Sequence, residues 1–396
     1  MNTEAFDPQR PLSGLLVLDM SLYLAGPFAS QRLQDFGARV IKIERPDGGD
    51  PSRGLYRSQD EIDSLLFHII NRGKESIALD LKNPADKDVV FALIKRADVL
   101  IQNYRPGVAE RLGFGYEAVS ALNPRLVYAS ISGYGSHGPW SELPGQDLLA
   151  QARSGIMWLS GDAEDAPTPT GLALGDVYTG VTAAQGIMAA LIGRSISGKG
   201  ALIETSLLET LIDLQFEQLA MFMNKGEKTP VRSDISNANA YAPAPYGVYK
   251  TADGYLALAM NPIEKLSNLL GLPCLMLFPF DPADPLVNRD EVKVLLATRL
   301  LSQTTAFWLD ILQPADIWCS EVMDWPTLLE SEQAEILDMI QSIRTSDDKV
   351  LKTTRLPLKL NGKRLSESKG GPALGANSAA IRAEVAEFVK EKALAQ

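Results

Sequence analysis

The stretch LLVLDMSLYLAGPFASQRLQDFGARVIKIERPDGGD, residues 15–50, decides the fold. Its first five residues form a short apolar run that is typical of a buried strand. Pro27 suits the first turn of a helix and Gly37 suits a left-handed position after one, so we expect a helix from about Pro27 to Phe36. Residues 39–44 read as a second strand. The stretch therefore predicts a strand–helix–strand unit with parallel strands.

The same alternation continues through the first half of the chain. Further strands are expected at 76–81, 98–103 and 126–131, with a helix at 83–95. Strands that alternate with helices predict an α/β fold built on a Rossmann-like, doubly wound parallel sheet. Such sheets bind ligands at the carboxyl ends of their strands. Here these ends are residues 19–26, 44–50, 103–107 and 132–138.

The length of 396 residues predicts more than one domain, because domains usually have ~100–200 residues. Two long apolar helices are expected at 176–194 and 207–224, and the polar stretch 225–245 is typical of a linker. The expected parts are a large domain at 1–225, a smaller α+β domain at 226–325, and a C-terminal segment at 326–396 that returns to the large domain.

Composition excludes several classes of function. The chain has 49 acidic and 38 basic side chains, and this net charge of −11 disfavours nucleic acid as a partner. Its two cysteines and two histidines are too few for a disulfide framework or a His-rich metal site, so no metal is expected. We find no secretory signal at the N-terminus and no run near the ~18 apolar residues of a spanning helix. The expected location is the cytoplasm, without a membrane partner.

One carboxylate is notable for its surroundings. Asp176 follows the small, apolar stretch 171–175 at the expected start of a long helix. Position alone favours an N-cap, in which the carboxylate accepts a backbone N–H. The apolar setting would leave the charge poorly solvated, however, and N–H groups at a helix start can stabilise an oxyanion on a bound carbonyl. Asp176 is therefore a candidate nucleophile.

Basic side chains lie near the predicted strand ends of this acidic chain. They are Arg45, Arg53, Arg72, Lys74, Arg105 and Arg111. This placement indicates an anion site, such as one for phosphate, although scattered surface charge explains any single residue equally well. The glycine turn at 48–49 matches neither a dinucleotide-binding pattern nor a P-loop.

Taken in order, six runs of sequence resemble the family III coenzyme A transferases. The runs are 15–27 (LLVLDMSLYLAGP), 37–50 (GARVIKIERPDGGD), 71–84 (NRGKESIALDLKNP), 97–113 (ADVLIQNYRPGVAERLG), 123–138 (NPRLVYASISGYGSHG) and 171–180 (GLALGDVYTG). Residues 372–375 (PALG) are similar to the C-terminal signature of that family. The resemblance is strong over residues 10–225 and weak over 225–350. It implies an interlocked homodimer and a catalytic role for Asp176. It also implies coenzyme A contacts at Tyr23, Arg45, Leu79, Asn103, Tyr104 and Arg111.

The chain departs from the resemblance at three places. Racemases of the family carry a Gly-His-Asp motif, but residues 145–147 read Gly-Gln-Asp. Formyl-CoA transferases carry Gln where Leu24 stands, and a glycine-rich lid of the oxalate enzymes is replaced by residues 237–243 (NANAYAP). A racemase and formyl or oxalyl specificity are therefore less expected than CoA transfer in general.

The expected function is transfer of CoA from an acyl-CoA to a free carboxylic acid, through a covalent aspartyl-CoA thioester on Asp176. Acyl-CoA and a small carboxylic acid are then the substrates, and no permanently bound cofactor is expected. Two alternatives stay open. One is a racemase or epimerase that uses Asp147 as its second proton-transfer group. The other is a non-catalytic acyl-CoA-binding protein in which Asp176 is a plain N-cap.

Overall fold

The protein is described here from a computed structural model that covers residues 9–59, 61–224, 226, 229–278, 284 and 286–394. These residues form two compact units. The first unit combines residues 9–150, 173–211 and 337–394, and the second combines 151–172 with the described residues of 212–336. The sequence predicts domains that fold independently, with boundaries at residues 225 and 326. These boundaries stay a prediction.

A six-stranded parallel sheet is the centre of the first unit. Its spatial order is β3-β2-β1-β4-β5-β6. The strands are β1 (Leu16–Asp19), β2 (Arg39–Glu44), β3 (Glu75–Ala78), β4 (Val99–Gln102), β5 (Val127–Ser132) and β6 (Leu202–Ser206). Leu18 of β1 pairs with Ile41 on one side and with Leu100 on the other. The predicted parallel sheet is confirmed, and its strand order reverses beside β1, where such folds place their ligands.

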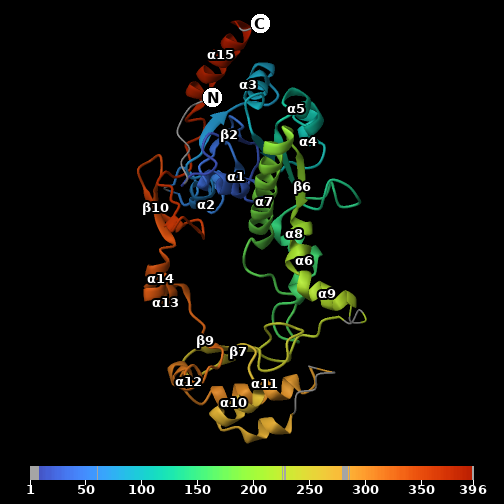
Figure 1. Cartoon of the computed structure of the whole chain (residues 1–396), viewed down its shortest axis with the longest axis vertical. Helices are drawn as coiled ribbons and strands as arrows, with labels where there is room; N and C mark the ends of the chain where they lie inside the picture. The colour runs from blue at the N-terminus through green and yellow to red at the C-terminus, as the bar shows by residue number, and fades with distance from the viewer. Residues whose placement is uncertain are drawn as a thin grey trace. The chain divides into compact units, whose positions relative to one another are not determined.

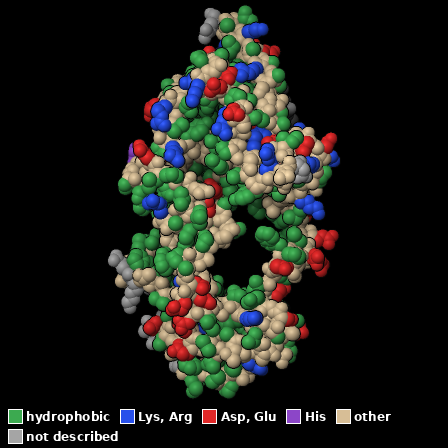
Figure 2. All heavy atoms as spheres, turned by 180° about the vertical axis from the view of Figure 1, so that it is seen from behind, with side chains coloured by type: hydrophobic (Ala, Val, Ile, Leu, Met, Phe, Trp, Pro, Cys, Tyr) green, Lys and Arg blue, Asp and Glu red, His purple; other side chains and the backbone are tan. Residues whose placement is uncertain are grey.

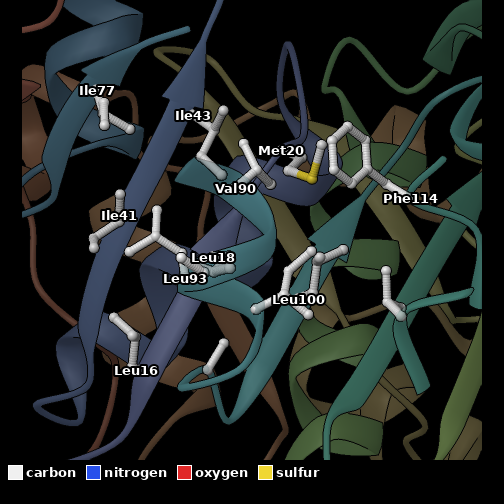
Figure 3. Packing of buried hydrophobic residues seen from close by; sticks show 14 of the residues in the cluster. Leu16, Leu18, Met20, Ile41, Ile43, Ile77, Val90, Leu93, Leu100 and Phe114 are labelled. Carbon is white, nitrogen blue, oxygen red and sulfur yellow. The ribbon is translucent and has the colours of Figure 1, made fainter. Parts of the chain in front are cut away.

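Helices cover both faces of this sheet. On one face α1 (Ala25–Asp35) and α7 (Leu174–Ser197) pack against each other, as Figure 1 shows. Alternate residues of the strands, such as Leu18 and Ile41, point to the opposite face and pack with Val90 and Leu93 of α3 (Pro84–Ile94) (Figure 3). The same core takes in residues of α5 (Tyr116–Leu122) and α15 (Ser378–Leu394). The remaining helices of this unit are α2 (Leu65–Ile70) and α4 (Val108–Leu112), and α6 (Asp147–Ser154) and α8 (Leu207–Leu214) begin in it.

The C-terminal residues complete the first unit. A hairpin of β10 (Ile340–Arg344) and β11 (Val350–Thr354) precedes a segment that runs beside the edge strand β3. There the Asn377 N–H donates to the Ser76 carbonyl at 2.9 Å, and the Gly375 N–H donates to the Ser76 hydroxyl at 2.9 Å. This segment includes the PALG run, so the signature lies on the exposed edge of the sheet and covers it.

The second unit has a core of its own. Strands β7 (Gly247–Lys250), β8 (Tyr255–Leu258) and β9 (Cys319–Glu321) form an antiparallel sheet. Helices α10 (Ile263–Leu270), α11 (Arg289–Leu300) and α12 (Thr305–Leu312) pack with it around Trp308, which is fully buried. Three further helices flank this core in sequence: α9 (Phe216–Asn224), α13 (Trp325–Glu330) and α14 (Glu332–Leu337).

One helix prediction was wrong in detail. The single helix expected at 207–224 is two helices, α8 and α9, with a break at Gln215. The Gln215 backbone N–H turns back to the Ile212 carbonyl at 3.1 Å, and its side-chain amide donates to the Ser154 carbonyl at 3.1 Å. A buried amide that satisfies a neighbouring carbonyl in this way fixes the break, and an apolar pattern does not reveal it. Among the described helices, none combines the length and apolar character that crossing a bilayer requires.

Candidate active site

The loop that joins β1 to α1 lies at the predicted ligand edge. Asn103 follows β4 and holds this loop on both sides of Leu22: its Oδ1 accepts from the Leu22 N–H at 2.8 Å, and its Nδ2 donates to the Leu22 carbonyl at 2.7 Å. The next N–H, of Tyr23, donates to Asp50 Oδ1 at 3.1 Å. Tyr23 has a φ of 63° and its side chain is 51% exposed. The loop therefore presents Tyr23 outward from a backbone that neighbouring side chains fix in place.

Asp176 lies inside the first turn of α7. The helix begins at Leu174, and its N-cap residue, Ala173, makes no side-chain hydrogen bond. The cap comes instead from α6, where Asp147 Oδ1 accepts from the Asp176 N–H at 3.1 Å. The N-cap alternative for Asp176 is therefore wrong, because the side chain that caps this helix start belongs to Asp147.

The Asp176 carboxylate is poorly solvated and lies beside a like charge. Burial, and then the charge of Asp147, raise the pKa of Asp176 from 3.8 to about 7, while a hydrogen bond from the Ala25 N–H acts to lower it. The carboxylate thus touches the end of the β1–α1 loop, since Ala25 is the first residue of α1. A carboxyl group that titrates near neutral pH in a partly closed site is a candidate for covalent or proton-transfer chemistry.

Two glycines allow these elements to approach. A Cβ on Gly175 would lie 3.0 Å from Asp147 Oδ1 and 3.1 Å from Leu211 Cδ1. A Cβ on Gly180, one turn further along α7, would lie 2.8 Å from the Ala25 carbonyl oxygen. The contact at Gly180 is with the backbone and excludes a side chain unless that backbone moves, whereas a Cβ at Gly175 would press on two side chains. The glycines of the 171–180 run therefore let α7 lie directly against α6 and α1.

The predicted coenzyme A contacts fall into two groups. Tyr23, Asn103 and Tyr104 lie in the β1–α1 loop or follow β4, and burial raises the pKa of the half-buried Tyr104 to about 12. Arg45 and Arg111 are exposed cations that follow β2 and end α4, respectively. Arg45 donates to the Gly49 carbonyl at 3.0 Å, and Arg111 lies over Gly107.

Leu79, the sixth predicted contact, belongs to neither group. Its side chain is fully buried in the sheet core with no exposed surface. Its backbone N–H donates to the Glu44 carbonyl at 2.8 Å. A ligand contact at Leu79 is therefore restricted to the remaining backbone carbonyl group.

A pocket of about 410 Å³ opens at the ends of β4, β5 and β6. Its lining combines backbone and hydroxyl groups with charges of both signs: Gln102, Tyr104, Arg105, Pro106, Gly107, Ala109, Glu110, Ser130, Ser132, Gly135, Ser136, His137, Glu204, Thr205 and Glu209. Tyr104 is the predicted contact that this pocket includes. Within the described residues, no three His, Cys, Asp or Glu side chains gather as a metal-binding group.

Sequence reasoning missed the charges beneath the loop. Lys42, in the middle of β2, is fully buried and forms an ion pair with Asp50 at 2.8 Å. Burial alone would lower the pKa of Lys42, but Asp19, Asp50 and Glu44 outweigh it and raise the pKa above its ordinary value. The signal was present, because a lysine between the apolar residues of a buried strand has to find a buried partner.

A family model described as CoA-transferase family III matches residues 12–378. The chain belongs to CoA-transferase family III. The resemblance drawn from the six sequence runs is thereby confirmed. The match covers nearly the whole chain, including the segments between 225 and 350 where the runs gave little support.

Members of family III with similar sequences carry names that state their substrates. An acetyl-CoA:oxalate CoA-transferase of Acetobacter aceti is 36% identical over 387 residues, which cover 96% of this chain and 97% of the relative. A succinate–glutarate CoA-transferase of Agrobacterium fabrum is 31% identical, with 95% and 96% covered. Among solved structures, a CaiB/BaiF family protein from Brucella suis has a TM-score of 0.80 at 30% identity and covers 95% of this chain and 100% of its own.

Proposed function

We propose that this protein is a CoA-transferase that moves CoA from an acyl-CoA to a free carboxylic acid through a covalent aspartyl-CoA thioester on Asp176. One observation carries the proposal. The Asp176 carboxylate lies in the first turn of α7, is poorly solvated, and lies beside Asp147, so that its pKa is raised to about 7. Membership of the family and the relatives' names support CoA transfer as the overall reaction.

The chemistry needs one nucleophile and no proton transfer. The ionised Asp176 oxygen attacks the thioester carbonyl carbon, the C–S bond breaks, and CoA leaves as a thiolate from a mixed anhydride. The thiolate attacks the Asp176 carbonyl carbon, which releases the donor carboxylate and leaves an aspartyl-CoA thioester. The acceptor carboxylate then attacks, and the same two steps run in reverse. Each tetrahedral oxyanion requires N–H donors, and the backbone N–H groups of Ala25 and Gly175 are the candidates.

The two groups of predicted contacts fit the two ends of coenzyme A. Arg45 and Arg111 are exposed and offer charge-assisted hydrogen bonds to the phosphates. Tyr23, Asn103 and Tyr104 lie on or beside the loop that leads to Ala25, and they suit the chain that carries the thioester toward Asp176. This assignment places the phosphates at the exposed strand ends and the sulfur at the start of α7.

The acceptor is proposed to be a short dicarboxylic acid. The names of the similar family members refer to oxalate in one case and to succinate and glutarate in the other. A mass-spectrometric panel of acyl-CoA donors with two- to five-carbon dicarboxylic acids, read for new CoA thioesters, identifies the pair. Transfer only to monocarboxylic acids would contradict the assignment of the acceptor and leave the transfer mechanism intact.

The protein is further proposed to act as a homodimer. The outer face of α7 is apolar and exposed at Val177, Val181, Ile192 and Ile196, with exposed fractions from 38% to 87%. Hydrophobic side chains are also widely exposed on the face drawn in Figure 2. A second copy of this chain would bury such surfaces. Light scattering at micromolar concentration should give the mass of a dimer, and a monomer would refute this assembly.

Trapping the covalent intermediate tests the mechanism. Incubation with an acyl-CoA should add a hydroxylamine-sensitive group to the peptide that contains Asp176, because anhydrides and thioesters of a carboxylate react with hydroxylamine. Asp176→Asn should fold and bind CoA but lose transfer by several orders of magnitude, since an amide oxygen is a poor nucleophile. The variant must be checked by mass for reversion to Asp. Normal turnover by intact Asp176→Asn would remove Asp176 from the mechanism.

The racemase alternative makes a different demand on the site. Two proton-transfer groups must lie on opposite sides of the substrate α-carbon, whereas Asp147 hydrogen-bonds to the Asp176 backbone and lies next to it. Deuterium uptake at the α-carbon of an acyl-CoA in heavy water, measured beside the adduct, separates the two reactions. Uptake without an adduct would favour racemisation.

A further inference from the structure

Side chains from several elements hold the start of the β1–α1 loop. The Ser21 N–H donates to Asp19 Oδ1 at 3.0 Å, and the Ser21 carbonyl accepts from Lys42 Nζ at 2.9 Å. Asp50 continues the series, because its Oδ1 accepts from the Tyr23 N–H while its Oδ2 pairs with Lys42. Lys42 and Asp50 therefore act together on two residues of the loop, on Ser21 through its carbonyl and on Tyr23 through its N–H.

Stability alone does not account for this ion pair. Lys42 and Asp50 have no exposed surface. Removing two charges from water costs several kcal/mol per ion, and well-packed apolar residues in place of a buried pair are often equally stable or better. What apolar residues cannot do is hold a backbone carbonyl and a backbone N–H at fixed positions. The pair is suited to positioning the loop.

The far end of this loop reaches the proposed nucleophile. Ala25 is the first residue of α1, which packs against α7, the helix that carries Asp176 in its first turn. The Ala25 carbonyl faces Gly180 so closely that a Cβ there would lie 2.8 Å from the oxygen. The Ala25 backbone is thus set against α7, and a displacement of the loop would move it relative to Asp176.

We propose that the buried Lys42–Asp50 ion pair is a positioning unit for the reaction, which holds residues 21–25 so that the Ala25 backbone stays in place against α7, near the reacting carboxylate. The inference rests on the proposed function of Asp176. Neither Lys42 nor Asp50 touches the substrate in this role. Their effect reaches the reaction through the loop backbone, so the proposal predicts a loss in the covalent step that exceeds what the loss of stability explains.

The test compares variants by the rate of adduct formation on Asp176 at saturating acyl-CoA. Asp50→Asn keeps the size of the side chain and one acceptor but loses the charge that pairs with Lys42. The double variant Lys42→Gln/Asp50→Asn removes both charges and leaves no unpaired ion between them, which protects folding. The matched control is Asp35→Asn, which breaks the buried Asp35–Arg72 ion pair at the other end of α1.

The two positioning variants should form the adduct at least ten-fold more slowly than the wild type, with faster hydrogen exchange of the amides in residues 21–25. The control should lose similar thermal stability while its adduct rate stays within two-fold. An adduct rate within two-fold for both positioning variants, or an equal loss in the control, would overturn the inference. Failure of the proposed function looks different, because the wild type itself would then form no adduct.

Discussion

Replacing Asp147 by Asn should raise the fraction of its plateau kcat/KM that the enzyme retains at acidic pH. The ionised form of Asp176 is the nucleophile, so kcat/KM for acyl-CoA in the wild type should rise with pH and level off above about 7, the pKa of Asp176. Asn at 147 still offers an oxygen to the Asp176 N–H, which preserves the helix cap, but it removes the neighbouring negative charge. The pKa of Asp176 should therefore fall, and the rise in kcat/KM should move to lower pH.

The size of the change follows from the order of the causes. The pKa of Asp176 lies about three pH units above its ordinary value of 3.8, and burial contributes more to this than Asp147 does. Removing the smaller cause should lower the midpoint by about one pH unit, or about 1.4 kcal/mol. At pH 5.5 the wild type should then retain about one thirtieth of its plateau, and Asp147→Asn about one quarter.

The assay is a pH profile of kcat/KM from pH 5 to pH 9, with each variant normalised to its own plateau. Normalisation separates the shift in midpoint from any general loss of activity. Glu142→Gln, a neutral substitution of an exposed carboxylate nearby in sequence, is the control and should leave the midpoint unchanged. A midpoint for Asp147→Asn that is unchanged or higher would refute the reasoning, because it would mean that Asp147 does not act on Asp176 through its charge.

Three further outcomes are expected. Arg45→Ala should raise KM for acyl-CoA by about ten- to a hundred-fold and KM for the acceptor acid much less, since charge-assisted hydrogen bonds are worth ~1.5–3 kcal/mol; equal changes would show that Arg45 does not bind CoA. Asp176→Asn should nearly match the wild type in stability at pH 4 and exceed it by up to about 4 kcal/mol above pH 7, because the native wild type retains a proton that the unfolded chain loses between pH 3.8 and about 7; parallel stability curves would contradict the raised pKa. Gly180→Ala should destabilise the protein by roughly 1–3 kcal/mol and slow adduct formation, because its Cβ would press on the Ala25 carbonyl; unchanged denaturation and rate would show that α7 has room to shift.

Five of the six strands could be predicted from sequence because the central strands are buried on both faces, whereas β6, which alternates exposed and partly buried residues, was missed. Strand β1 was expected at 15–19 and lies at Leu16–Asp19, since a short apolar run marks a buried parallel strand directly. The helix break at Gln215 could not be predicted, because it depends on a carbonyl of Ser154, sixty-one residues away. The burial of the Leu79 side chain was equally hidden, because a resemblance identifies a position without saying whether its side chain or its backbone meets the ligand.

The candidate site could likewise be predicted only in part from the sequence. Asp176 could be singled out because small and apolar residues surround it in sequence. Its pairing with Asp147 needed the structure, since the two are 29 residues apart and the contact leaves only tight space beside Gly175. The Lys42–Asp50 pair needed the structure too, because a buried lysine indicates that a carboxylate partner exists without indicating which one.

A carboxylate with the raised pKa of Asp176 is better suited to act as a nucleophile than one with an ordinary pKa. A carboxylate with a pKa near 4 is fully ionised at neutral pH, but it is a weak base and therefore a weak nucleophile toward a thioester. Burial and Asp147 raise the basicity of Asp176, and with a pKa of about 7 roughly half of the groups remain ionised at neutral pH. The Ala25 N–H opposes a further rise, which would leave too few ionised groups to react. The β1–α1 loop, α6 and α7 thus act on one carboxylate in opposite directions, and the balance depends on how closely they approach.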